Sequence, residues 1–263
     1  MGLFAALALW MTVCRPVPGE EQLWSGQTTR YVIVGEVHGT TQVPELFGDL
    51  ACAAHASGRP VVVGVEMSET AQPDLDRFLG SDGRTAAVRA FLASPAWRSP
   101  MKDGRSSRSY LQLIERLRVL KRAGEIAAVV AIQPSGDTAE QPSADGFNAA
   151  MADRIRSAGK LSPRAIVLVL VGNLHASKHP VHFGDQVITP AAADLPPAET
   201  ISVNVETGGK AWNCSGPSTC GVHDLIGVPP RKREVRLDRS VEGNYDGVVD
   251  LGIPATASLP AVK

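Results

Sequence analysis

Four short apolar runs, separated by helical patterns, constrain the fold of this chain more than any other feature of its sequence. The runs are Tyr31–Val34, Val61–Val65, Ala127–Ile132 and Ala165–Val171. Each run is short and rich in β-branched residues, so we predict strands that are buried on both faces. Such strands, alternating with helices, indicate a largely parallel sheet that helices cover.

The stretches around these runs predict the remaining elements. Helices are expected over Val43–Ala56, Ala71–Leu79, Thr85–Leu92, Ser109–Ala123 and Ala144–Ala158. Shorter strands are expected near the end of the chain, at Ile201–Val205, Glu234–Leu237 and Tyr245–Leu251. The segments Asp137–Asp145 and Gly208–Pro230 are expected to be surface loops. We therefore predict one α/β domain over residues 25–258, with a mostly parallel sheet flanked by helices and shorter strands at its C-terminal end.

The charge of the chain argues against nucleic acid as the main partner. The chain has 263 residues, enough for one large domain, and a formal net charge of −1. Proteins that neutralise phosphates carry clustered lysine and arginine, whereas the short run Arg231-Lys-Arg233 is more typical of a solvated loop edge. A small molecule or a peptide is the expected substrate.

The first residues differ from the rest of the chain. Gly2 to Cys14 is apolar throughout, too short to span a bilayer, and typical of the hydrophobic region of a signal peptide. We predict that residues 1–19 are a signal peptide or an N-terminal anchor, so that the protein is exported to the periplasm or associated with a membrane. Because a basic start and a clear cleavage site are missing, a buried N-terminal segment and a lipid anchor at Cys14 stay open.

The other cysteines suit an oxidising compartment. Cys214 and Cys220 lie six residues apart in a loop of glycine, serine and proline, where a disulfide is predicted and a metal clip is the alternative. Cys52 lies in an alanine-rich helical pattern and is predicted to pack as a small apolar residue. The predicted disulfide agrees with export.

Polar side chains follow three of the four predicted strands. Glu36 and His38 come after the first strand, Glu66 after the second and His175 after the fourth, and each histidine ends a Gly-x-x-His motif. The carboxyl ends of parallel strands meet at one edge of a sheet, where ligands bind, so we expect these side chains to converge. Any one of them is more often a satisfied turn residue. Two carboxylates that need partners indicate, together with two histidines, a functional cluster.

The cluster allows more than one chemistry. His38, Glu66 and His175 form a normal set of ligands for a catalytic divalent metal, and the two histidines are candidate ligands of a haem iron. His179 and His182 continue an H-x3-H-x2-H pattern in a loop that contains proline, and are weaker candidates. The sequence contains no G-x-S-x-G, Walker A, G-x-G-x-x-G or H-E-x-x-H motif. These absences argue against a serine hydrolase, a kinase and a dinucleotide-binding enzyme.

Three motifs, taken in order, resemble the erythromycin esterase/ChaN/Tiki (TraB) superfamily. They are VIVGEVHGTTQVPEL, VVVGVEMSETAQPDLDRFL and VLVGNLHASK, and their short Gly-Glu-x-His form is most similar to the ChaN-like, haem-binding-uptake branch. The superfamily includes esterases that cleave a macrolide lactone, proposed metal-dependent proteases and haem-binding lipoproteins. The resemblance implies an α/β sheet with a cleft in which Glu36, His38, Glu66 and His175 occupy the motif positions.

One helix departs from the family pattern. The family often has an arginine ahead of an asparagine and a Met-Ala pair, whereas this chain has Phe147, followed by Asn148 and Met151. Arg154, a turn or so later, either takes the place of that arginine or lies on the surface.

These observations lead to two main functional hypotheses. The first is a hydrolase of an ester or a peptide, in which His38 or Glu66 acts as a general base on a water, with or without a divalent metal. The alternative is an exported haem- or iron-binding protein of the ChaN type. A family member that keeps only a structural or interaction role is a third reading.

Overall fold

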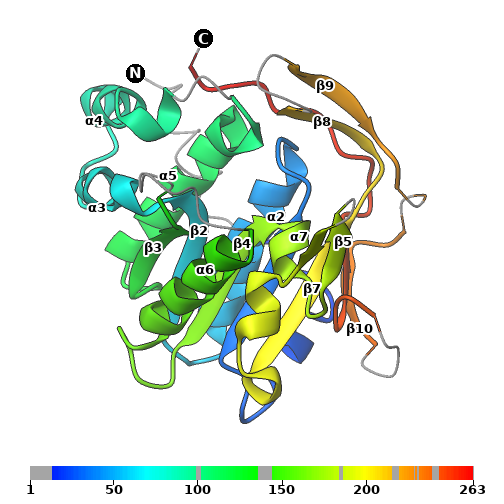
Figure 1. Ribbon diagram of the computed structural model, residues 1–263. Coiled ribbons are helices and arrows are strands. Elements are labelled where there is room, and N and C mark those ends of the chain that lie inside the picture. Colours follow the sequence, from blue (N-terminus) through cyan, green and yellow to red (C-terminus); the bar gives the residue numbers. More distant parts are fainter. Residues whose placement is uncertain are drawn as a thin grey trace.

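The computed structural model describes residues 14–98, 102–135, 144–183, 186–214, 219–227, 229, 231–238 and 243–262. Within these ranges the largest sheet has seven strands, in the order β10-β11-β7-β1-β4-β2-β3 (Figure 1). Its strands are β1 (Tyr31–Glu36), β2 (Val61–Ser68), β3 (Ala128–Gln133), β4 (Ile166–Gly172), β7 (Thr200–Glu206), β10 (Glu234–Leu237) and β11 (Gly247–Asp250). Only β10 and β11 pair antiparallel. The predicted fold class is therefore confirmed.

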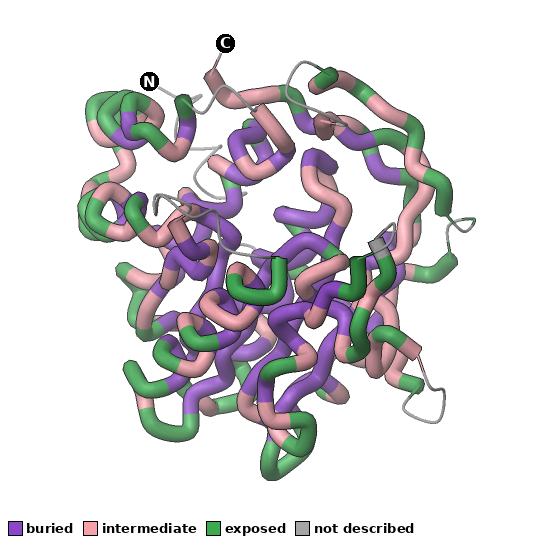
Figure 2. Tube along the Cα trace, viewed as in Figure 1, coloured by how far each residue is buried: buried purple, intermediate pink, exposed green. Residues whose placement is uncertain are grey.

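Helices cover both faces of this sheet. The helices are α2 (Gln42–Ala56), α3 (Gln72–Leu79), α4 (Thr85–Leu92) and α5 (Arg108–Arg122) on one face, and α6 (Ala144–Gly159) on the other. Val32 and Val34 of β1 belong to the first core, and Ile33 between them belongs to the second. Because successive side chains of a strand point to opposite faces, an unbroken apolar run is required here. Figure 2 shows the central strands as buried and the outer turns of the helices as exposed.

Short elements connect these layers. Single-turn 3₁₀ helices occupy Glu20–Leu23 (η1), Glu69–Ala71 (η2), Pro95–Trp97 (η3), Gly104–Ser106 (η4), Ala191–Asp194 (η5) and Pro197–Glu199 (η6), and a four-residue α-helix occupies Asn173–Ala176 (α7). A small hairpin pairs β5 (Val181–Phe183) with β6 (Gln186–Ile188). No helix of the described ranges is both long and apolar enough to cross a bilayer.

The predicted surface loop Gly208–Pro230 is partly wrong. It contains an antiparallel hairpin of β8 (Gly209–Cys214) and β9 (Cys220–Leu225), which lies apart from the main sheet in Figure 1. Trp212 explains why the hairpin is ordered, since its indole Nε1 donates to the carbonyl of Lys102 at 2.8 Å and its backbone N donates to Gly39 at 2.9 Å. The partners in these contacts lie far from Trp212 in the sequence, so no local sequence pattern predicts them.

Both disulfides lie outside the sheet. Cys214 and Cys220 are bonded at the end of the β8–β9 hairpin, as predicted. Cys52 is buried in the first core, as predicted, but it is also bonded to Cys14, which was not predicted. Val17, just after Cys14, is fully buried in the first core. The packed segment thus begins before residue 25, the start that the sequence pattern gave, and residues 1–13 of the predicted leader lie outside the described residues.

Candidate active site

The strand order brings the four predicted side chains together. Strand β4 lies between β1 and β2 and is parallel to both, so the carboxyl ends of all three meet at one edge. Glu36 is the last residue of β1, Glu66 lies within β2, and His175 lies on α7 directly after β4. Glu66 is the common neighbour, with Oε2 3.4 Å from His38 Nε2 and Oε1 3.9 Å from His175 Nε2.

Glu66 is an anion whose oxygens are already occupied. Its side chain is 2% exposed, Oε1 accepts from Arg105 Nη1 at 2.7 Å, and Oε2 accepts from the backbone N of Gly172 at 2.7 Å. A Cβ on Gly172 would lie 3.1 Å from His38 Nε2, so the glycine allows this close approach. Burial alone would raise the pKa of Glu66, but the charges of His38 and Arg105 hold it well below its usual range.

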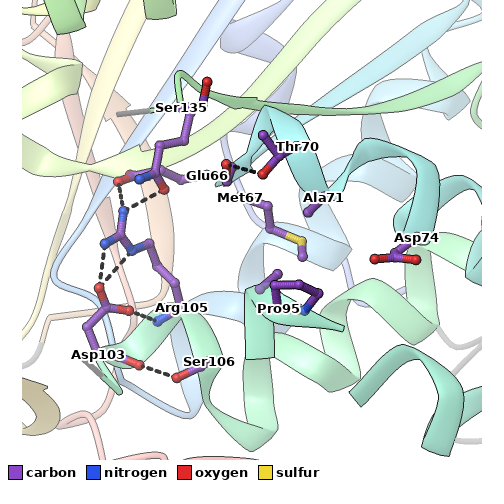
Figure 3. A pocket seen from close by; sticks show the side chains of 13 residues that line it. Glu66, Met67, Thr70, Ala71, Asp74, Pro95, Asp103, Arg105, Ser106 and Ser135 are labelled. Atoms are coloured by element: carbon purple, nitrogen blue, oxygen red, sulfur yellow. Dashed lines mark hydrogen bonds and ion pairs between the residues drawn. The ribbon is translucent and has the colours of Figure 1, made fainter. Parts of the chain in front are cut away.

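Arg105 completes the cluster, and sequence reasoning missed it. It lies in η4, ahead of α5, where the carboxylate of Asp103 accepts from both its backbone N and its Nε at 3.0 Å (Figure 3). Its Nη1 also donates to Gln133 Oε1 at 2.9 Å. A Cβ on Gly104 would lie 1.9 Å from the backbone N of Gly39, so only a glycine lets this loop approach the turn after His38. This approach delivers the guanidinium to Glu66.

His38 is held between two carboxylates. Its Nδ1 lies 2.9 Å from Glu36 Oε1, and its Nε2 faces Glu66. Burial alone would lower the pKa of His38, but the Glu66 charge and the hydrogen bond to Glu36 raise it to about 10. The imidazole is therefore a cation at neutral pH, with a proton on each nitrogen. Burial raises the pKa of Glu36, although the hydrogen bond from His38 opposes this shift.

His175 is in the opposite state. Its Nδ1 lies 2.7 Å from Asn148 Oδ1, and the orientation of that amide is fixed because Nδ2 donates to the carbonyl of Ala144 and Oδ1 accepts from the backbone N of Ala191. The asparagine oxygen can only accept, so Nδ1 carries the proton and Nε2 carries the lone pair. Burial lowers the pKa of His175, which keeps the ring neutral at pH 7. The ring of Phe147 packs beside that of His175, with 5.8 Å between the ring centroids.

Among the described residues, Arg154, the candidate replacement for the arginine expected ahead of Asn148, makes no hydrogen bond or ion pair with Glu66, His38 or His175. Its Nε and Nη2 donate to the carbonyl of Ala131 at 3.0 and 2.8 Å, and its Nη1 pairs with Glu69. It therefore fastens α6 to β3. The guanidinium of the cluster comes from Arg105 instead.

The two weaker histidine candidates lie outside the cluster. The side chains of His179 and His182 are exposed, and no hydrogen bond or ion pair of the described residues links either of them to Glu66. The H-x3-H-x2-H pattern is therefore not a ligand set in this structure.

A pocket of about 410 Å³ lies beside the Glu66–Arg105 pair (Figure 3). Its walls combine the thioether of Met67 with the hydroxyls of Ser68, Thr70, Ser106 and Ser135. Figure 3 shows the Met67 side chain extending between Ala71 and Pro95. The volume is within the range of small-molecule sites, so a modest substrate fits next to the cluster.

The donor set was also compared with the needs of a metal. Within the described residues, the one group of His, Cys, Asp and Glu side chains whose ligand atoms all lie within 4.8 Å of one another is Cys14, Cys52 and Glu125, and its cysteines are disulfide-bonded. His38, Glu66 and His175 do not form such a group. Glu66 contacts Arg105, the two histidines and the Gly172 N–H.

The fold and the cluster thus define an α/β protein with buried, charged side chains at the carboxyl edge of a mostly parallel sheet. No family model and no curated protein matches the sequence. Among solved structures, the chain is similar to a variant of the erythromycin esterase EreC in its open conformation, with a TM-score of 0.59, 11% identity, and coverage of 89% of this chain and 92% of that one. The chain therefore shares the fold of an erythromycin esterase.

Two further structures match less well. The type III effector HopBA1 has a TM-score of 0.48 and 17% identity over 90% of this chain and 95% of its own. A Bacillus cereus protein has a TM-score of 0.46 and 10% identity over 82% of this chain and 79% of its own. These likenesses are too distant to support a functional argument.

Proposed function

We propose that the protein is a hydrolase that cleaves an ester by acid–base catalysis without a metal, with His175 as the general base. The observation that carries the proposal is the pairing of His175 with Asn148. This pairing leaves the imidazole neutral, with its lone pair on Nε2. His175 Nε2 lies 3.9 Å from Glu66 Oε1, and Glu66 in turn pairs with His38 and Arg105. A base of this kind, with a pKa below or near the working pH, is suited to take a proton from water.

The cationic half of the cluster has a separate role. His38 and Arg105 hold positive charge against Glu66, and this charge stabilises the oxyanion that develops when water attacks an ester carbonyl. Glu66 keeps both cations in place and is a poor base, because its oxygens accept several hydrogen bonds. The sequence analysis predicted His38 or Glu66 as the general base, and we assign this role to His175 instead.

Ester hydrolysis is preferred over peptide hydrolysis because one of the solved structures with a similar fold, with a TM-score of 0.59, is an erythromycin esterase. A divalent metal held by His38, Glu66 and His175 is disfavoured because Arg105 and the Gly172 N–H already bind the Glu66 oxygens. Both choices are open to direct tests.

The first test is hydrolysis of para-nitrophenyl acetate and butyrate by the wild-type protein, with and without EDTA. We expect turnover that EDTA leaves unchanged, and a loss of about 10²–10⁴-fold in His175→Gln, since this is the usual contribution of a general base. His179→Gln is the matched control, because His179 is an exposed histidine only four residues away. Turnover that survives in His175→Gln, or that EDTA abolishes, would contradict the proposal.

The haem-binding alternative is tested in the same preparation. In this reading the protein belongs to the ChaN-like branch, and His175 Nε2 is the candidate axial ligand because it carries a lone pair. Titration with haemin that gives a Soret shift in the wild type, but not in His175→Gln, would favour this alternative. A titration without a shift would favour the hydrolase.

We also propose that the protein works in an oxidising compartment after export. The support is that Cys14–Cys52 and Cys214–Cys220 are both disulfides, which form outside the reducing cytosol. Thiol labelling of the denatured protein, isolated from its cellular source without reductant, should find no reactive thiol. Full labelling would contradict the proposal.

A further inference from the structure

A second hollow lies at the opposite edge of the main sheet, where three neighbouring strands begin. Arg30 directly precedes β1, Arg164 lies two residues ahead of β4, and Arg59 lies two residues ahead of β2. Since β4 pairs in parallel with both β1 and β2, the three arginines reach this edge side by side. All three line a hollow of about 560 Å³, which shares no residue with the Glu–His cluster.

The three guanidinium groups have no carboxylate partner. No Asp or Glu oxygen of the described residues lies within 4.0 Å of any of their nitrogens. Arg30 uses Nη2 to donate to the carbonyl of Gly159 at 2.7 Å, and Arg59 uses Nε to donate to the carbonyl of Arg164 at 3.2 Å. Glu199 is the one acidic residue among those that line the hollow. Three arginines and one acidic residue therefore line the hollow.

This concentration of positive charge is unfavourable in the free protein. Burial and the nearby charge of Arg30 both lower the pKa of Arg59, which means that the protonated guanidinium is penalised there. Like charges held together without a counter-charge are normally avoided unless a ligand supplies the opposite charge.

The backbone of Arg164 adds an independent observation. Its φ is 61°, and it is the only non-glycine residue of the described ranges with positive φ. The left-handed conformation is strained for a residue with a Cβ, relative to the right-handed one. The strained residue lines the hollow, and its backbone carbonyl accepts a hydrogen bond from Arg59 Nε. Strain of this kind tends to be retained where it serves a site.

Neutral donors line the same hollow. Ser25, Gln27 and Thr29 contribute hydroxyl and amide groups, and Trp24 forms part of the wall. Guanidinium forks surrounded by hydroxyl and amide donors are the usual partners of phosphate oxygens. A tetrahedral anion with more than one negative charge matches this set better than a neutral ligand does.

We propose that the hollow formed by Arg30, Arg59 and Arg164 binds a phosphoryl group, carried either by free phosphate or by a small phosphate ester. The arginines neutralise its charge, and the hydroxyl and amide groups donate hydrogen bonds to its oxygens. Binding relieves the repulsion between Arg30 and Arg59. The site lies at the far edge of the sheet from the catalytic cluster, so this proposal stands whether or not the protein is a hydrolase.

The test is calorimetric titration of the full chain with inorganic phosphate and with phenyl phosphate, at constant ionic strength. We expect saturable one-to-one binding in the wild type and at least tenfold weaker binding in Arg59→Gln. Arg89→Gln, which alters an exposed arginine of α4, should bind like the wild type. Tighter binding of phenyl phosphate assigns the site to an ester, and tighter binding of inorganic phosphate assigns it to the free anion.

Arg164→Gly separates binding from folding. Glycine tolerates a φ of 61° without strain, so this variant should have a Tm equal to or above that of the wild type when phosphate is absent. It should nevertheless bind phosphate at least tenfold more weakly, because one guanidinium is gone. The proposal would be overturned if the wild type showed no saturable binding at millimolar phosphate. It would also be overturned if the wild type, Arg59→Gln and Arg164→Gly bound phosphate equally, since this would indicate an adventitious ion only.

Discussion

The two Gly-x-x-His motifs of this chain stand side by side and end in opposite electrostatic states. The first leads from β1 to His38 and the second leads from β4 to His175, on neighbouring strands of one sheet. His38 lies between the carboxylates of Glu36 and Glu66, and its pKa is raised to about 10. His175 lies against the neutral amide of Asn148, and its pKa is lowered.

This difference shows that the motif sets the position of an imidazole and its neighbours set the chemistry. The turn after a parallel strand places either histidine at the ligand-binding edge. A carboxylate beside Nδ1 favours the imidazolium, whereas an amide oxygen beside Nδ1 fixes a neutral tautomer. In the proposed function, one motif supplies a cation for charge stabilisation, and the other supplies a base.

The largest effect is expected from removing the charge that the two halves share. Glu66→Gln leaves Arg105 and His38 without their buried counter-charge, so the free energy of unfolding should fall by about 3–5 kcal/mol. Urea unfolding measures it. Glu45→Gln is the matched control, because the exposed Glu45–Arg15 pair should contribute no more than about 1 kcal/mol. Equal losses in both variants would show that Glu66 does not organise the cluster.

A smaller effect is expected from making the two histidines alike. Asn148→Asp places a carboxylate against His175 Nδ1, which should raise the acid limb of the kcat/KM–pH profile by about one pH unit or more. At pH values on the acid limb, activity should then fall by about tenfold, since a larger share of the base is protonated there. The control is Asn173→Asp, which adds the same charge at an exposed position of α7, the short helix that carries His175. This variant should leave the kcat/KM–pH profile unchanged. An acid limb that moves equally in both variants would sink the assignment of His175.

The smallest effect is expected in the pH dependence of stability. The pKa of His38 is about 10 in the folded protein and about 6.5 in the unfolded chain, so the folded state holds the extra proton between these values. The stability that His38 contributes is complete below pH 6.5 and is lost as the pH rises toward 10. Between pH 7 and 8 this loss should be about 1 kcal/mol. His38→Gln should show a flatter dependence, and an unchanged slope would contradict the shift.

The sequence predicted the parts of the site that follow from local rules. Glu36, His38, Glu66 and His175 could be placed because polar residues after apolar parallel strands meet at one edge. Arg105 could not, because it lies in a loop between helices and reaches Glu66 only through the close packing of Gly104 on Gly39. The Asp-Gly-Arg sequence of that loop is a weak signal at best.

The fold followed the same division. The sheet, its helices and the C-terminal strands could be read from periodicity and β-branched content. The β8–β9 hairpin was read as a loop because its order depends on Trp212, whose partners lie far away in sequence. The Cys14–Cys52 disulfide was missed for the same reason, since a spacing of 38 residues carries no pairing information.

The central claim is that His38 is charged and His175 is neutral in the same protein at the same pH. Long-range proton–nitrogen NMR spectra of the histidine side chains report this directly, and His38→Gln and His175→Gln assign the two rings. At pH 7.5 the account predicts two protonated nitrogens for His38, and for His175 a protonated Nδ1 with a free Nε2. A neutral His38, or a His175 that is protonated on both nitrogens, would contradict it.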